Sequence, residues 1–262
     1  MRSCFSSFLI AGSALSLLSG ATTSANADQG FVTLFNGRDM TGWHGQRTED
    51  PRKFQALSPD ERKEHLAKDA EDARLHWSVK DGALVNDGKG VYLTSDKDYG
   101  DIELYISYKL LPKGDSGLYL KATPQVQIWD YTEPTYRRFD AQLGSGGLWN
   151  NAPNSPGKNP LVLADRPIGE WNELHIIQIG EKTTVSLNGK LVVDFARLEN
   201  YWNKSLPLVP KGPIQLQTHG NEVRWKDIRV REIEADEANK ILAKHGAEGF
   251  TPIFAGKDLS GW

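Results

Sequence analysis

The stretch DIELYISYKLLPKGDSGLYLKATPQVQIWD, residues 101–130, decides the fold of this chain. It predicts three β-strands, because apolar and polar residues alternate along it and successive residues of a strand point to opposite faces of a sheet. The apolar positions predict a buried core made of Ile102, Leu104, Ile106, Tyr108, Leu118, Leu120, Val126 and Ile128.

The alternate positions of these strands predict one shared polar face. They are Glu103, Tyr105, Ser107, Tyr119, Lys121, Gln127 and Trp129, with Asp130 at the strand end. Aromatic rings stack on the faces of a sugar, and carboxylates, amines and amides bind its hydroxyls, so we expect a carbohydrate site here. The competing interpretation is that the rings pack under a loop and that Glu103 and Lys121 form a cross-strand ion pair.

Short strands and tight turns continue on both sides of this stretch. Asn-Gly or Asp-Gly pairs at 36–37, 81–82 and 188–189 predict hairpin turns. Further strands are predicted at 31–35, 76–85, 91–94, 171–179, 183–187, 191–195, 213–220 and 223–230. Many short strands and few helices indicate an all-β, two-sheet sandwich of jelly-roll type, formed by one domain over residues 28–234.

A charged insertion over residues 48–74 interrupts the strands. Ser58 as N-cap, Pro59 at the first helical position and acids in the first turn predict a short surface helix. Its apolar stripe is weak. We therefore expect a solvated excursion, with a helix that borders the site as the alternative.

The two ends of the chain differ from the rest. Residues 1–27 predict a secretory signal peptide, cleaved after Ala27, and hence a periplasmic or secreted protein with no membrane contact after cleavage. Residues 235–248 predict a helical linker. Residues 249–262 match residues 30–43 at half of their positions, which predicts the truncated start of a second domain copy; an extra edge strand is the alternative.

Composition excludes several classes of function. The net charge of −3 comes without any basic run, which argues against a nucleic-acid partner. The only cysteine, Cys4, lies in the predicted signal, so the mature chain is expected to have neither a disulfide nor a thiol nucleophile. No zinc or EF-hand pattern occurs, which leaves the metal unknown, and scattered loop oxygens remain open as ligands of a divalent ion.

Two further segments are candidates for function. His219 has the strand parity of Gln215 and Gln217 rather than that of the core, so a catalytic role and a structural one weigh evenly. The loop 131–166 is long enough to be functional or mobile. The sequence Gly-Asp-Ser-Gly at 114–117 is similar to the nucleophile segment of trypsin-like proteases, but it equally suits a turn between strands.

An ordered set of motifs resembles the 3-keto-disaccharide hydrolase family, whose members act as 3-keto-glycoside lyases and 3-keto-2-hydroxy-glucal hydratases. The motifs are LFNGRDMTGW, WSVKDGALV, YGDIELYISYKL, DSGLYLK, VQIWD, GEWNELHI, LNGKLVVDF, GPIQLQTHG and VRWKDIRV. They extend from Phe31 to about Ile233, outside the insertion and the long loop. The resemblance implies a concanavalin-like jelly roll.

Three positions depart from the family pattern. Asp115 stands where the family usually has Asn, Lys121 where it usually has Arg, and Pro124-Gln125 where it often has Tyr-Glu. The lysine keeps the positive charge but lacks the guanidinium fork. The missing Glu puts in doubt any catalytic role that the family places there.

The resemblance also implies a reaction. A ketone at C3 acidifies the C2 proton, so a base removes it, the C1 substituent leaves, and water then adds. The expected base is His219 or Asp130, the expected electrophile is Lys121, and Glu103 is a candidate acid. Sugar contacts are expected from Tyr105, Tyr119, Gln127, Trp129 and Gln217. The alternative function is a non-catalytic carbohydrate-binding module of a secreted protein.

Overall fold

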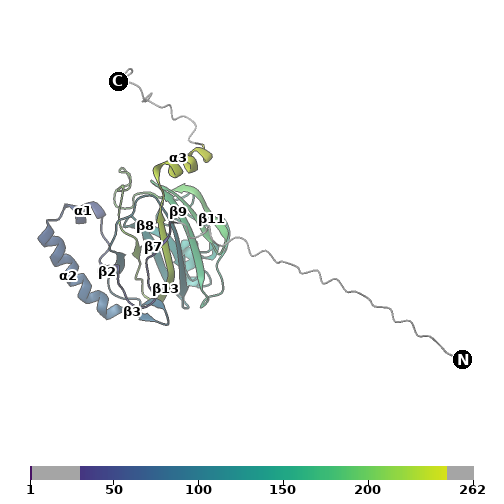
Figure 1. Cartoon of the computed structure of the whole chain (residues 1–262), viewed down its shortest axis with the longest axis horizontal. Coiled ribbons are helices and arrows are strands. Elements are labelled where there is room, and N and C mark those ends of the chain that lie inside the picture. Colours follow the sequence, from purple (N-terminus) through teal and green to yellow (C-terminus); the bar gives the residue numbers. More distant parts are fainter. Residues whose placement is uncertain (2–29, 247–262) are drawn as a thin grey trace, which may run out of the picture.

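The computed structural model describes residue 1 and residues 30–246, so the predicted signal peptide and the C-terminal repeat lie outside the described residues. Two antiparallel sheets pack face to face (Figure 1). Sheet A has the order β11 (Lys190–Arg197), β10 (Lys182–Leu187), β9 (Asn172–Ile179), β6 (Ile102–Leu110), β13 (Val223–Glu232), β4 (Ala83–Asn86) and β3 (Trp77–Lys80), with β1 (Val32–Thr33) paired to β13. Sheet B has the order β2 (Trp43–Gln46), β5 (Tyr92–Ser95), β12 (Gln215–Leu216), β7 (Asp115–Leu120) and β8 (Thr123–Trp129). The predicted all-β jelly-roll sandwich is confirmed.

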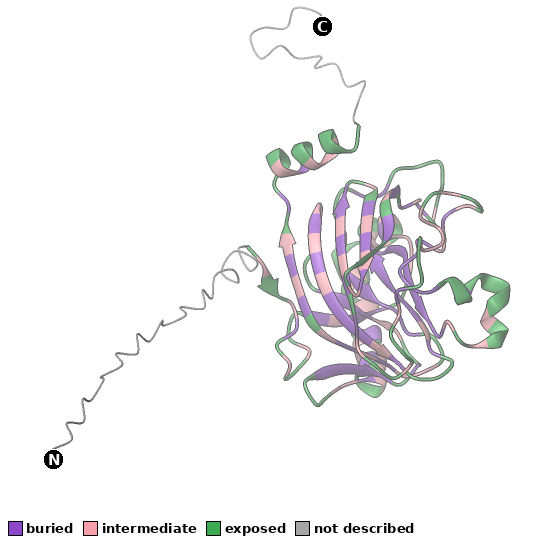
Figure 2. Cartoon of the chain, turned by 90° about the vertical axis from the view of Figure 1, so that its right-hand side faces the viewer, coloured by how far each residue is buried: buried purple, intermediate pink, exposed green. Residues whose placement is uncertain are grey.

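The predicted core lies between the two sheets. All eight apolar side chains of the central stretch are at most 2 % exposed. Figure 2 shows the alternation of buried and partly buried residues as stripes along the strands next to the C-terminal helix. Burying one such side chain contributes about 1.5–3 kcal/mol, so the alternating pattern supplies much of the energy that closes the sandwich.

The prediction of one shared polar face is wrong. Strand β6 belongs to sheet A, whereas β7 and β8 belong to sheet B. The turn after Leu110 carries the chain from one sheet to the other, so the outward positions of β6 and of β7–β8 lie on opposite surfaces of the sandwich. Alternation tells inside from outside, but it does not say to which sheet a strand belongs.

The insertion forms two helices, α1 (Pro51–Ala56) and α2 (Pro59–His76). The predicted start of the second helix is confirmed, because Ser58 and Glu61 form a capping box. Most of α2 is exposed, as expected of a surface helix, but its C-terminal half, with the buried Asp69 and Ala73, packs on the sheet. A Cβ on Gly45 of β2 would lie 2.5 Å from Ala73 Cβ, and Arg47 binds the buried Asp69 of α2 at 2.6 Å. Helix α2 therefore packs directly on the edge of sheet B (Figure 1).

Two short 3-10 helices, η1 (Pro134–Phe139) and η2 (Ala141–Leu143), interrupt the long loop. The predicted C-terminal helix is α3 (Ala235–Lys244), whose Ala238 packs on Ile179 and Ile233. Within residues 30–246, no helix has the length and apolar character needed to cross a membrane.

Candidate functional site

The outer face of sheet B carries a continuous row of polar side chains, most of which are buried. Residues paired across neighbouring strands share a face, so strand register places side chains in rows. One row consists of His44, Thr94, Gln215 and Tyr119. Their neighbours Leu93, Leu216 and Leu118 point into the core, which fixes this row on the outside.

Amide side chains link β8 to β7 on this face. The Gln125 amide donates to Gln127 Oε1, and Gln127 Nε2 donates to Asp115 Oδ1 at 2.8 Å and to the Ser116 carbonyl at 2.9 Å. Gly117 lies at the centre of this network. A Cβ there would be 2.7 Å from Gln125 Oε1 and 2.9 Å from Gln217 Oε1. The two amides therefore occupy the space that a side chain at residue 117 would need.

His219 stands at the rim of the same network. Its Nδ1 lies 3.3 Å from Asp115 Oδ2, and 61 % of its side chain is exposed. The hydrogen bond to the Asp115 carboxylate raises the pKa of His219 above its ordinary value, against an opposing effect of partial burial. A histidine that is reachable from solvent and paired with a carboxylate is suited to accept a proton.

The floor of this face has unused hydrogen-bonding capacity. Gln215 Oε1 and Gln217 Oε1 are buried and find no hydrogen-bond partner in the described part of the chain. Beside them, the hydroxyl of Tyr119 lies 3.4 Å from that of Tyr92, and burial raises the pKa of Tyr119. Buried polar atoms without partners are costly, so a ligand or water that supplied hydrogen bonds here would be stabilised.

Two predicted residues at the end of β8 have structural roles. The carboxylate of Asp130 is buried and accepts hydrogen bonds from Lys113 N at 2.8 Å, Thr132 N at 2.9 Å and Thr132 Oγ1 at 2.6 Å. Trp129 is 4 % exposed and donates to the Gly144 carbonyl, with its ring edge-on to Trp149. Asp130 therefore fixes a turn and Trp129 packs under the long loop, as the competing interpretation of the rings expected.

Glu103 and Tyr105 lie on the outer face of sheet A, away from His219. Glu103 binds His175 at 2.7 Å and Arg231 at 2.6 Å, and Tyr105 stacks on His175 with ring centroids 4.2 Å apart. Hydrogen bonding from His175 lowers the pKa of Glu103. An acid that is held as a paired carboxylate on the opposite sheet cannot serve a reaction at His219.

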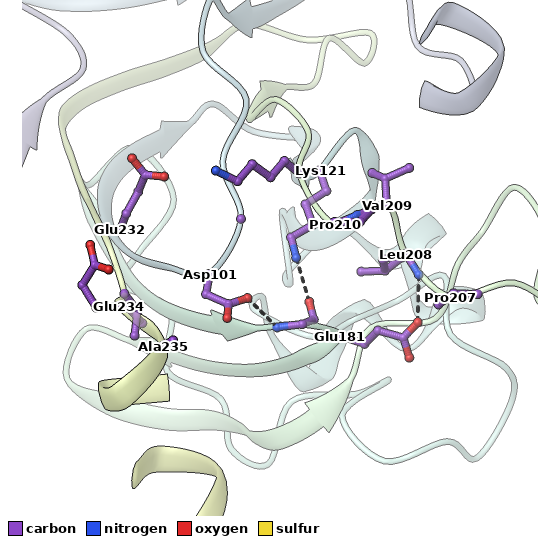
Figure 3. A pocket seen from close by; sticks show the side chains of 14 residues that line it. Asp101, Lys121, Glu181, Pro207, Leu208, Val209, Pro210, Glu232, Glu234 and Ala235 are labelled. Atoms are coloured by element: carbon purple, nitrogen blue, oxygen red, sulfur yellow. Dashed lines mark hydrogen bonds between the residues drawn. The ribbon is translucent and has the colours of Figure 1, made fainter. Parts of the chain in front are cut away.

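Lys121 also lies far from His219. It sits in the β7–β8 turn with φ +54°, about 20 Å along the sheet from Asp115. Its ammonium donates to the Gly180 carbonyl at 3.0 Å in a separate cavity of about 740 Å³ beside α3, where burial lowers its pKa (Figure 3). The predicted pairing of Lys121 with Glu103 does not form, and Lys121 is not in reach of the polar face.

Two other patterns can be compared with the structure. Ser116 is fully buried and donates to the Gln217 carbonyl at 2.7 Å, so the Gly-Asp-Ser-Gly segment is part of a strand. Among residues 30–246, no group of three or more His, Cys, Asp or Glu side chains is arranged to hold a metal ion.

Sequence reasoning therefore found Tyr119, Gln127, Gln217 and His219, which the structure places on one face. It did not assign Asp115, Gln125 or Gln215 to the site. Extending the alternation of β7 back by two pairs from Tyr119 leads to Asp115, so the signal was present in the same strand. Gln125 carried the same signal, because it lies two residues before Gln127 in β8 and therefore shares its face.

Aromatic and amide side chains on the outer face of a two-sheet jelly roll suit a sugar ligand. The model of the 3-keto-alpha-glucoside-1,2-lyase-like domain matches residues 30–231. The chain belongs to this family, as the motifs predicted.

Individual relatives are distant. A 3-keto-disaccharide hydrolase of Bacteroides thetaiotaomicron is 23 % identical over 257 residues, which cover 78 % of this chain and 79 % of that protein. Two crystal structures from Parabacteroides distasonis, both provisionally named as glycosyl hydrolases, have the same fold. One has a TM-score of 0.54 at 20 % identity, over 81 % of this chain and 98 % of the other; the second has a TM-score of 0.55 at 22 % identity, over 78 % and 84 %.

Proposed function

We propose that this protein is an enzyme that cleaves 3-keto-glycosides by abstraction of the C2 proton, elimination at C1 and hydration of the product. The observation that carries the proposal is the pair formed by His219 and Asp115 at the rim of the outer face of sheet B, 3.3 Å apart. Membership of the lyase-like family and the hydrolase name of the Bacteroides relative support the same chemistry.

Each step needs one kind of group. Neutral His219 takes the C2 proton, Asp115 stabilises the imidazolium that forms, and the C1 substituent leaves as an alcohol whose oxygen takes its proton from solvent. The developing enolate oxygen at C3 needs a hydrogen-bond donor. Gln217 offers an amide two residues from His219, about 7 Å along the chain, on the same side of the segment. Because Lys121 is too distant, Gln217 replaces it in this role.

The polar floor binds the sugar. Gln127 is fixed by its bonds to Asp115 and to the Ser116 carbonyl, so it contributes mainly to the position of Asp115. The buried oxygens of Gln215 and Gln217 accept hydrogen bonds from sugar hydroxyls once these reach the floor. Tyr119 provides an aromatic edge beside them.

The test is incubation of the full chain with a 3-keto-glucoside, followed by ultraviolet absorbance of the enone 3-keto-2-hydroxy-glucal. Appearance of the enone, or consumption of added enone by hydration, is the expected result. A protein that binds unoxidised glycans but changes neither compound would overturn the proposal in favour of a carbohydrate-binding module.

A further inference from the structure

A second cavity, of about 310 Å³, lies between the inserted helices and the edge of sheet B. Its walls come from α1 and α2 on one side and from β2 and the end of β5 on the other. Figure 1 shows the two helices on the β2 side of the sandwich. Its volume falls at the lower end of the range of small-molecule pockets, about 300–1,000 Å³.

The cavity is held in shape by contacts at both ends of the insertion. Arg47 and Asp69 join β2 to α2, and the close approach at Gly45 leaves no room for α2 to slide. At the other end, Arg52 of α1 donates to the Pro207 carbonyl at 2.5 Å. The helices are therefore fixed against the sheet and the cavity is preformed.

The side chains around this cavity combine an apolar platform with hydrogen-bonding groups. Phe54 and Leu66 provide half-buried apolar surface from the two helices. Arg62 of α2 lines the same cavity, and its Nε is buried without a hydrogen-bond partner in the described chain. His44 is bound to Asp96 at 2.7 Å on the sheet side.

The charges indicate the class of ligand. Three carboxylates line the cavity, those of Glu49, Asp96 and Asp98, with the Arg62 guanidinium and with His44, which is paired with Asp96. An anionic ligand would meet this excess of negative charge and is disfavoured. A neutral ring with several hydroxyls donates to the carboxylates, accepts from Arg62 and places an apolar face on Phe54.

We propose that this cavity is a binding site for a neutral pyranose, separate from the site at His219. The wall residue Ala122 is seven residues from Asp115 along β7 and the following turn, about 20 Å away. The cavity wall includes His44, so the cavity adjoins the polar face at its β2 edge, two strands away from β12, whose continuation carries His219. This site does not depend on the proposed reaction.

The test is isothermal titration of the full chain with the methyl glycosides of glucose, galactose and mannose, and with glucuronate as the anionic probe. Saturable binding of at least one neutral glycoside is expected, with affinity at least tenfold lower in Arg62→Ala and in Phe54→Ala. Arg74→Ala, an exposed residue of the same helix outside the cavity, is the matched control and keeps the affinity. His219→Ala keeps the affinity as well.

Three results would overturn this site: no binding of any neutral glycoside, wild-type affinity in both Arg62→Ala and Phe54→Ala, or tighter binding of glucuronate. The outcome is distinguishable from that of the proposed reaction. Loss of 3-keto-glucoside turnover in His219→Ala, with glycoside binding intact, supports both proposals. Glycoside binding without turnover in the wild type keeps the cavity site and removes the reaction.

Discussion

The outer face of sheet A satisfies its charged groups, whereas the outer face of sheet B leaves polar atoms without partners. On sheet A, Arg231 bridges Glu103 and Glu237, and His175 completes the cluster. On sheet B, the oxygens of Gln215 and Gln217 are buried and unpartnered within the described residues. Both faces combine rings, carboxylates and histidine, so residue types alone do not separate a structural surface from a functional one. The two surfaces are distinguished by the polar atoms that remain without hydrogen-bond partners.

The largest expected effect comes from replacing the histidine on each sheet by alanine and comparing the two variants. His219→Ala is expected to lower turnover of a 3-keto-glucoside about 100- to 10,000-fold, the usual contribution of a general base. His175→Ala on sheet A is the matched control and is expected to keep turnover. Steady-state kinetics of both variants measure this. Equal losses of turnover in both variants would contradict the assignment of the reaction to sheet B.

Removing Glu103 tests the structural role of sheet A. Glu103→Ala is expected to lower the free energy of unfolding by about 2 kcal/mol, because hydrogen bonds to charged partners are lost, and to leave turnover unchanged. His175 lowers the pKa of Glu103, so its contribution is present above the unfolded pKa and disappears as pH falls through the folded value. Urea unfolding over a pH series should show a weaker acid dependence in the variant. A loss of turnover without loss of stability would contradict this role.

A methyl group at the centre of sheet B tests the amide network. Gly117→Ala places a Cβ against the Gln125 and Gln217 oxygens, which are ends of flexible side chains, so they move while the strand stays in place. We expect about a tenfold loss in kcat/KM from misplaced groups, with little change in melting temperature. Gly100→Ala is the control, since its Cβ would meet its nearest neighbour at 3.6 Å. Equal kinetics of the two variants would remove the network from the site.

The smallest effect is a shift in pH dependence. Asp115 raises the pKa of His219, so the neutral, active imidazole forms only at higher pH. Asp115→Asn is expected to move the acid limb of the kcat/KM profile to lower pH and to lower the maximum rate. The pH profile of the wild type and the variant shows this directly. An unchanged acid limb would assign it to another group.

The sequence predicted the layers of the fold well, for a physical reason. Alternating apolar residues indicate the buried face of a strand, so the pattern predicted core positions such as Leu104 and Leu118. It did not predict the pairing of strands, because β6 and β7 are consecutive in the chain but lie in different sheets. For this reason Glu103 and Tyr105 were assigned to the wrong surface.

The candidate site was partly predictable. Tyr119, Gln127 and Gln217 followed from strand parity, which holds within one sheet. The distance of Lys121 from His219 did not follow, because parity gives the face and not the position along it. The partners of Asp130 come from its own turn and from Lys113 in the β6–β7 turn, and only three-dimensional geometry distinguishes such a carboxylate from a free base.

The most direct test of the account is the fate of the C2 hydrogen. The full chain would be incubated with a 3-keto-glucoside that carries deuterium at C2, and the sugar product would be analysed by NMR against a sample without protein. Proton abstraction on the outer face of sheet B predicts that the label is lost to solvent in step with turnover and that His219→Ala stops both. Turnover with the deuterium retained at C2 would contradict elimination and require direct hydrolysis at C1.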